Sequence, residues 1–398
     1  SWDAWLPDTW AECQSLLERA LAALPENDSR NRALVTARLA DIPIWSLEKR
    51  ERFAADALAM AERLGDLKAM WPALFVCYRL GYRCGRADER LELATRIVRV
   101  TEAAGVADAA LQGHGMRYIE LLVRGRVRES EAEFHAMEEW AERTGEPGKR
   151  AIPPLLRAGR ALWEGRFDEA ETGVAEARSD LGHGVGRHPK IIAAGLRFWL
   201  RAFQGRLSEM APRMANISGL GRWAATDVCA RMWMNHRLGH RDAARRDLEA
   251  MVPDAVELPV EYGRFACLAI LSEVAADLGD RVRCERLLAE LEPEAGLQLL
   301  FGPEVLFGCA SRPLGMLARA LGRSDEAERH FEVALDADTR MGARPWVAET
   351  QLEYAALLLE RGGSDDRRRA EALLDQAYAT ADELGMAAVT RRAERLQH

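Results

Sequence analysis

The chain has 398 residues, of which 48% are hydrophobic and 30% are charged, and its formal net charge is −8. This composition excludes a disordered chain, and the negative charge argues against a nucleic-acid-binding or membrane-surface protein. No apolar run approaches the roughly 20 residues of a membrane-spanning helix. The seven scattered cysteines favour a reducing compartment over a disulfide framework, so we expect a cytoplasmic location.

The first 29 residues are less regular than the rest of the chain. Trp2, Trp5 and Trp10 precede a leucine-rich stretch that favours a helix, and Pro25 predicts the turn after it. We interpret residues 1–29 as an N-terminal capping helix or as a linker from an upstream domain. Whether they belong to the array that follows is left open.

A glycine that closes an apolar helix recurs along residues 30–386. From Gly85 to Gly362 these glycines follow at intervals of 40, 40, 40, 34, 40, 43 and 40 residues. A second series, which includes Gly65 and Gly105, lies out of phase with the first. Each unit is therefore predicted to be a helix, a tight turn, a second helix and a looser turn.

The unit is clearest at residues 322–335, GRSDEAERHFEVAL. One helix ends at Gly322, and the next is predicted to begin with Ser324 as its N-cap. Four apolar side chains share one face of this second helix: Ala327, Phe331, Ala334 and Leu335. The small alanine lets the preceding helix approach closely, and the aromatic ring fills the seam between the helices. This pattern resembles the second half of a tetratricopeptide repeat.

One helical pair cannot bury its own apolar face, so neighbouring pairs must stack. We predict an all-α fold, a right-handed superhelix of stacked antiparallel helical hairpins with tetratricopeptide-like repeats of about 40 residues. No stretch shows the alternation of a strand bounded by hairpin turns, and residues 293–303 are expected to be a long connection between units. Residues 387–398 are interpreted as a C-terminal capping helix.

Motifs of catalysis and metal binding are missing from the sequence. The segment GEPGKR at 145–150 lacks the spacing of a phosphate-binding loop, and no serine lies in a nucleophile elbow. His236 and His240 are four residues apart, but Gly239 between them is expected to end the helix. We therefore expect no enzyme, no cofactor and no metal ion.

The candidate binding residues lie on the first helix of each pair, at the positions that point inward in a tetratricopeptide superhelix. Seven of them carry aromatic, cationic or imidazole groups: Phe75, Arg79, Tyr82, Trp199, Trp233, His236 and Arg312. Aromatic rings beside polar groups in a groove suit a sugar or a peptide. The alternative is that the rings only pack between helices, because large apolar residues at helical spacing are usually core.

A further resemblance covers roughly the last ninety residues. Residues 340–361, RMGARPWVAETQLEYAALLLER, are similar to the C-terminal helical-repeat region of large bacterial signal-transduction ATPases, of the MalT and LuxR type or coupled to nucleotide cyclases and kinases. The resemblance implies a sensor or docking arm beside a nucleotide-switch module. The ATPase loop and the DNA-binding end of that architecture are missing from this sequence, so no catalytic residue is carried over. Because the chain begins at Ser1 without a methionine, we expect an excised fragment, so that any output domain lies upstream or has been trimmed away.

We therefore predict a non-catalytic sensor or interaction domain of a bacterial regulatory protein. Its groove is expected to bind a protein partner, an upstream ATPase or effector domain, a small-molecule inducer or a peptide, but no nucleic acid and no membrane. One alternative is a pure protein–protein scaffold with a long open groove. Another is an α/α-toroid enzyme, in which the first and last hairpins touch and paired carboxylates face one mouth.

Overall fold

The computed structural model describes residues 10–180, 187–214, 224–253, 258 and 263–397. Its first half contains α1 (Trp10–Ala23), α2 (Arg30–Ala40), α3 (Leu47–Leu64), α4 (Leu67–Leu80), α5 (Ala87–Ala104), α6 (Ala107–Val123), α7 (Val127–Thr144), α8 (Pro147–Arg150), α9 (Ile152–Glu164) and α10 (Phe167–Asp180). Its second half contains α11 (Arg187–Phe203), η2 (Leu207–Met210), α12 (Ala211–Met214), α13 (Ala224–Arg237), α14 (Arg241–Met251), α15 (Arg264–Leu278), α16 (Arg281–Leu291), η3 (Glu292–Glu294), β1 (Gln298–Phe301), β2 (Val305–Cys309), α17 (Ser311–Ala320), α18 (Ser324–Met341), α19 (Arg344–Arg361), α20 (Ser364–Leu384) and α21 (Ala387–Gln397).

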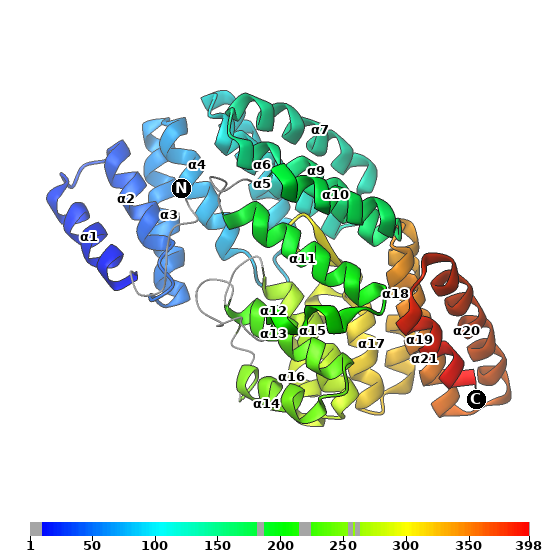
Figure 1. Ribbon diagram of the computed structural model, residues 1–398. Helices are drawn as coiled ribbons and strands as arrows, with labels where there is room; N and C mark the ends of the chain where they lie inside the picture. Colours follow the sequence, from blue (N-terminus) through cyan, green and yellow to red (C-terminus); the bar gives the residue numbers. More distant parts are fainter. Residues whose placement is uncertain (1–9, 181–186, 215–223, 254–257, 259–262, 398) are drawn as a thin grey trace.

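Consecutive helices pack as pairs, and the pairs stack into an elongated array (Figure 1). The predicted class, an all-α array of stacked antiparallel helical hairpins, is confirmed. Helices α1–α3 lie at one end of the array and α20 and α21 at the other, so the first and last hairpins do not meet as they would in a toroid. Of the segment 1–29, residues 1–9 lie outside the described residues, and α1 packs against α2.

The turn glycines have the backbone conformation that the periodic pattern requires. Both predicted series have positive φ, from 62° at Gly65 to 88° at Gly165, where an L side chain would be strained. The unit at α17 and α18 packs as predicted, because Phe331 is fully buried and lies against Gly315 of the preceding helix. The predicted N-cap is wrong by one residue: Ser324 is already helical, and Arg323 occupies the cap position without a side-chain hydrogen bond.

The segment expected to be an irregular connection forms a β-hairpin instead. Strands β1 and β2 pair antiparallel, with Leu300 opposite Leu306 and Phe301 opposite Val305. Apolar side chains on both faces of this hairpin are buried, including Leu299 and Phe307. A strand that is covered on both faces reads as a continuous apolar run, and therefore the sequence shows no alternation there.

The hairpin fills the interior of the array and joins distant units. Strand β1 contacts α6 and α15, while β2 contacts α9, α17 and α18. Indole Nε1 of Trp346 on α19 donates a hydrogen bond of 3.0 Å to the backbone oxygen of Leu306. Helices far apart in sequence also meet directly, because α9 contacts α19 and α11 contacts α21. The β-hairpin therefore occupies the concave side of the array in the region where it contacts these helices.

Gly159 of α9 is expected to be essential for docking the hairpin. A Cβ atom at this position would overlap the backbone carbonyl oxygen of Glu304, at the tip of the hairpin. We expect Gly159→Ala to lower the free energy of unfolding by about 1–3 kcal/mol, the usual cost of overpacking. Urea unfolding of the full chain measures this effect.

Gly195→Ala provides the matched control, because Gly195 is also inside a helix but an added Cβ would meet nothing within 4 Å. That change should stabilise the helix by about 0.5–1 kcal/mol. Equal stability changes for the two variants would show that the hairpin does not need the close approach at Gly159.

Candidate functional site

The predicted groove residues are buried by other parts of the chain. The exposed fraction of the whole residue is 7% or less for six of them: Phe75, Arg79, Tyr82, Trp199, Trp233 and Arg312. The side chain of the seventh, His236, is 7% exposed. The structure separates these residues into two groups, one in α4 and the turn directly after it and one between α11 and α19.

The aromatic members of the second group, Trp199 and Trp233, pack against each other beside the hairpin. The ring centroids of Trp199 and Trp233 are 4.7 Å apart, and Phe307 of β2 lies 4.8 Å from Trp199 in an edge-on arrangement. The ring centroid of Phe203 lies 5.3 Å from that of Trp346 on α19. These aromatic residues therefore form a packed core between distant units. This agrees with the alternative interpretation of the tryptophans, in which their rings only pack between helices.

The polar members of that group form a buried charge network centred on Glu273 of α15. Its carboxylate accepts a hydrogen bond of 2.7 Å from Trp233 Nε1 and pairs with Arg237 at 2.8 Å and with Arg312 at 3.2 Å. Burial raises the pKa of Glu273, but the charges of Arg237 and Arg312 more than offset this, and the net pKa lies below its usual value. Arg312 also lies over the ring of Trp346, 4.8 Å from its centroid.

The network continues into α19 and α21, and each of its charged groups has an oppositely charged neighbour. Arg237 approaches Glu349 at 3.6 Å, and Arg392 of α21 binds Glu353 at 2.5 Å. His236 Nε2 lies 2.9 Å from the carboxylate of Asp277. Burial raises the pKa of Asp277, yet the hydrogen bond from His236 and the nearby arginines bring it down to about 2. Because each of these charged groups already has an opposite charge beside it, we assign this network to holding α13, α15, α19 and α21 together.

The first group of predicted residues belongs to the packing of the N-terminal units. Arg79 forms a buried ion pair with Asp41, which follows α2. Tyr82 lies 5.9 Å from Phe265 of α15, and Phe75 lies edge-on to Trp71. These contacts fix α4 against its neighbours and, through Tyr82, against the middle of the array.

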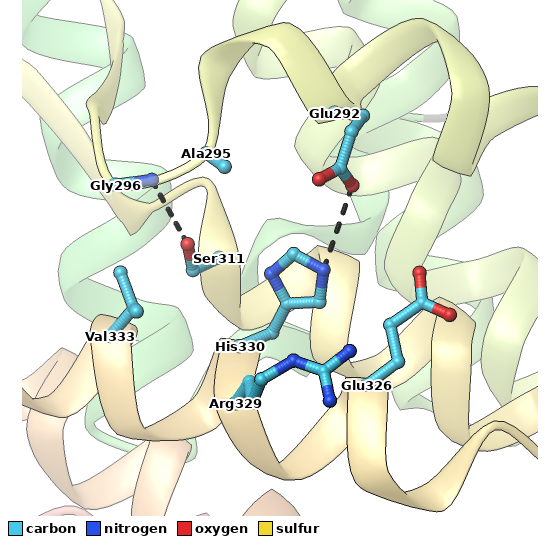
Figure 2. Close-up of a pocket in the computed structure, with 8 residues that line it drawn as sticks. All are labelled: Glu292, Ala295, Gly296, Ser311, Glu326, Arg329, His330 and Val333. Carbon is cyan, nitrogen blue, oxygen red and sulfur yellow. Dashed lines mark hydrogen bonds and ion pairs between the residues drawn. The ribbon is translucent and has the colours of Figure 1, made fainter.

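A pocket lies at the base of the β-hairpin, on the side of α18 (Figure 2). Its volume is about 380 Å³, within the range of small-molecule sites. The residues that line it come from both ends of the hairpin and from α18: Glu292, Ala295, Gly296, Ser311, Glu326, Arg329, His330 and Val333. The amide of Gly296, just before β1, donates a hydrogen bond of 2.9 Å to the hydroxyl of Ser311, just after β2. This bond closes the base of the hairpin beside the pocket.

Helix α18 supplies the polar wall of the pocket because of its periodicity. Residues at i, i+3, i+4 and i+7 share one helical face, and Glu326, Arg329, His330 and Val333 have this spacing. The opposite wall is η3, which begins with Glu292 directly after α16. Figure 2 shows the imidazole of His330 facing Glu292, with Glu326 beside it on the helix. The distance between His330 Nε2 and Glu292 Oε2 is 3.6 Å.

The electrostatics of the pocket favour a neutral imidazole between carboxylates. Burial lowers the pKa of His330, although the negative charges of Glu292 and Glu326 oppose the shift. One ligand atom from each of these three residues lies within 4.8 Å of the other two. An imidazole and two carboxylates are donors that divalent metal ions accept, so these three residues form a cluster that could hold a metal ion.

The sequence analysis predicted no metal ion and did not single out this cluster. Part of the pattern of a metal site is nevertheless present in the sequence. Glu326 and His330 have the i, i+4 spacing that places two ligands on one helical face. Glu292 belongs to the preceding unit, and only the fold brings it to α18.

No family model matches the sequence, and a search of curated proteins finds no match. Among solved structures, the chain is similar to the human IFIT1 dimer with m7Gppp-AAAA, at 14% identity over 100% of this chain and 96% of that chain, with a TM-score of 0.37. It is also similar to a circular tandem repeat protein with novel repeat topology and enhanced subunit contact surfaces, at 15% identity over 98% and 94% of the two chains, with a TM-score of 0.20. Similarity at these TM-scores carries no argument about ligand or assembly.

In the part of the chain that the structure describes, we find no helix with the length and hydropathy needed to cross a membrane.

Proposed function

We propose that this chain is a non-catalytic sensing module, in which a ligand bound at the base of the β-hairpin stabilises the packed arrangement of the helical array. The observation that carries this proposal is the position of the pocket. Its lining includes Gly296 and Ser311, which flank the two strands, and the strands contact helices of both halves of the array. An occupant of the pocket would therefore favour the state in which the hairpin is docked.

We also propose a regulatory context for this sensing module. The resemblance of residues 340–361 to bacterial signal-transduction ATPases supports a role as the sensor arm of such a regulator, acting on an attached ATPase or effector domain. A pure scaffold would present a long open groove, and the hairpin together with Trp199 and Trp346 fills the interior instead. We therefore favour sensing by a small ligand over docking of an extended peptide along the interior.

A thermal-shift screen of the full chain against sugars, nucleotides, amino acids and short peptides tests the proposal. A compound that binds only the folded state raises the melting temperature by mass action. We expect the shift to disappear in Val333→Phe, because Val333 lines the pocket and its side chain is exposed enough to be enlarged without disturbing the core.

The matched control is Val282→Phe, since Val282 is also exposed on a helix but does not line the pocket. Its response to the compound should equal that of the unmodified chain. A shift that survives Val333→Phe, or a bound compound that leaves hydrogen exchange of the hairpin amides unchanged, would contradict the proposal.

A further inference from the structure

We infer that Glu292, Glu326 and His330 form a binding site for a divalent transition-metal ion, with Zn²⁺ as the best match. The three side chains supply one imidazole nitrogen and two carboxylate oxygens, the donor types found in zinc sites with three protein ligands. Such a site keeps at least one coordination position open for water or for a ligand. For its regulatory consequence, though not for the binding itself, this inference rests on the proposed function.

The geometry requires little rearrangement to close around an ion. Zinc–nitrogen and zinc–oxygen bonds are about 2.0–2.2 Å long, so two ligand atoms of one tetrahedral ion lie about 3.4 Å apart. The ligand atoms of the three residues already lie within 4.8 Å of one another. Two of them are held by one face of α18, and the side chain of Glu292 is half exposed and can rotate toward them.

The surroundings distinguish this cluster from a chance group of surface acids. His330 is largely buried, with 12% of its side chain exposed, and it lines a pocket of about 380 Å³. Its contact with Glu292, at 3.6 Å, is longer than a hydrogen bond. Arg329 lines the same pocket, so a negatively charged group bound at the open coordination position would meet a positive charge.

A bound ion would connect the two sides of the hairpin. Glu292 precedes β1 in the chain, whereas Glu326 and His330 follow β2. Coordination would therefore fix η3 to α18 and hold the hairpin between them. This makes the metal either the sensed ligand itself or the group through which a second ligand binds.

Isothermal titration calorimetry with ZnCl₂ on the full chain, after treatment with a chelator, tests the inference. We expect one equivalent of Zn²⁺ to bind. Glu326→Gln and His330→Ala should each weaken binding by at least about tenfold, because even the loss of an outer-shell partner costs about 10–100-fold. Glu326→Gln keeps the shape of the side chain, so weaker binding by this variant does not depend on misfolding.

His135→Ala is the matched control. His135 lies 3.1 Å from Glu138 on α7, an exposed histidine–carboxylate pair outside the cluster. Zinc binding should be unchanged in this variant. Cobalt(II) spectra provide the second control, since a thiolate charge-transfer band would place the ion on one of the seven cysteines instead. That band, no binding by the unmodified chain, or unchanged binding by both pocket variants would overturn the inference.

Hydrogen exchange of the hairpin separates this inference from the proposed function. If Zn²⁺ binds but leaves exchange of the β2 amides unchanged, the metal site stands and the sensing proposal fails. If Zn²⁺ does not bind but an organic compound does so at Val333, the metal site fails and the sensing proposal stands.

Discussion

Glu273→Gln is expected to lower the free energy of unfolding by about 3–5 kcal/mol, the usual cost of removing one partner of a buried ion pair. The substitution keeps the shape of the side chain but removes the negative charge that Arg237 and Arg312 share. Glu273 is 2% exposed, so water cannot replace the lost interaction. Equilibrium unfolding in urea at neutral pH measures the effect.

Glu285→Gln is the control for this prediction. Glu285 also pairs with an arginine, Arg323, at 2.6 Å, but 52% of its side chain is exposed. Exposed pairs of this kind contribute about 0–1 kcal/mol. If the two variants lose the same stability, the network around Glu273 does not hold the helices together in the way its geometry indicates.

Raising the pH from about 5 to about 8 is expected to destabilise the protein through two buried carboxyl groups, one in the hairpin and one in contact with it. Burial raises the pKa of Glu304, at the hairpin tip, to about 8. Burial also raises the pKa of Asp338 on α18 to about 7, although this carboxylate accepts a hydrogen bond of 2.9 Å from the amide of Cys309 on β2. In the unfolded chain both groups lose their protons near pH 4.

The sign follows from proton linkage. Between about pH 4 and pH 8 the folded state holds more protons than the unfolded state, so the free energy of unfolding falls as the pH rises. This loss of stability is absent below about pH 4 and complete above about pH 8. Since one pKa unit corresponds to about 1.4 kcal/mol, the destabilisation is up to about 5 kcal/mol for Glu304 and up to about 4 kcal/mol for Asp338. Urea unfolding across this range measures the slope.

Neutral variants separate these two groups from other titrations. Asp338→Asn and Glu304→Gln should each flatten the pH dependence and raise stability at about pH 8 by a few kcal/mol, as they remove a charge that is buried. Asp336→Asn is the control, because Asp336 is on the same helix but its side chain is 62% exposed. An unchanged slope in both hairpin variants would contradict the assignment.

The sequence by itself determined the local architecture of this protein. Glycine spacing and the apolar face at Ala327 and Phe331 fixed the helical pairs, because a helix face and a left-handed turn depend on residues only a few positions apart. The same pattern placed Trp199 and Trp233 at inward-facing positions of a groove, and the structure shows both side chains buried. It failed at Ser324 by one residue, since cap geometry depends on the exact path of the turn.

Only the tertiary structure decided what occupies the inside of the array. The small rotation between successive pairs accumulates, so that α9 meets α19 and α11 meets α21, and no local pattern encodes that sum. The hairpin escaped the sequence analysis because a strand buried on both faces shows no alternation. The residues of the network around Glu273, and Glu292 with His330, lie far apart in the sequence. Only the tertiary structure therefore shows that these side chains from separate units come together.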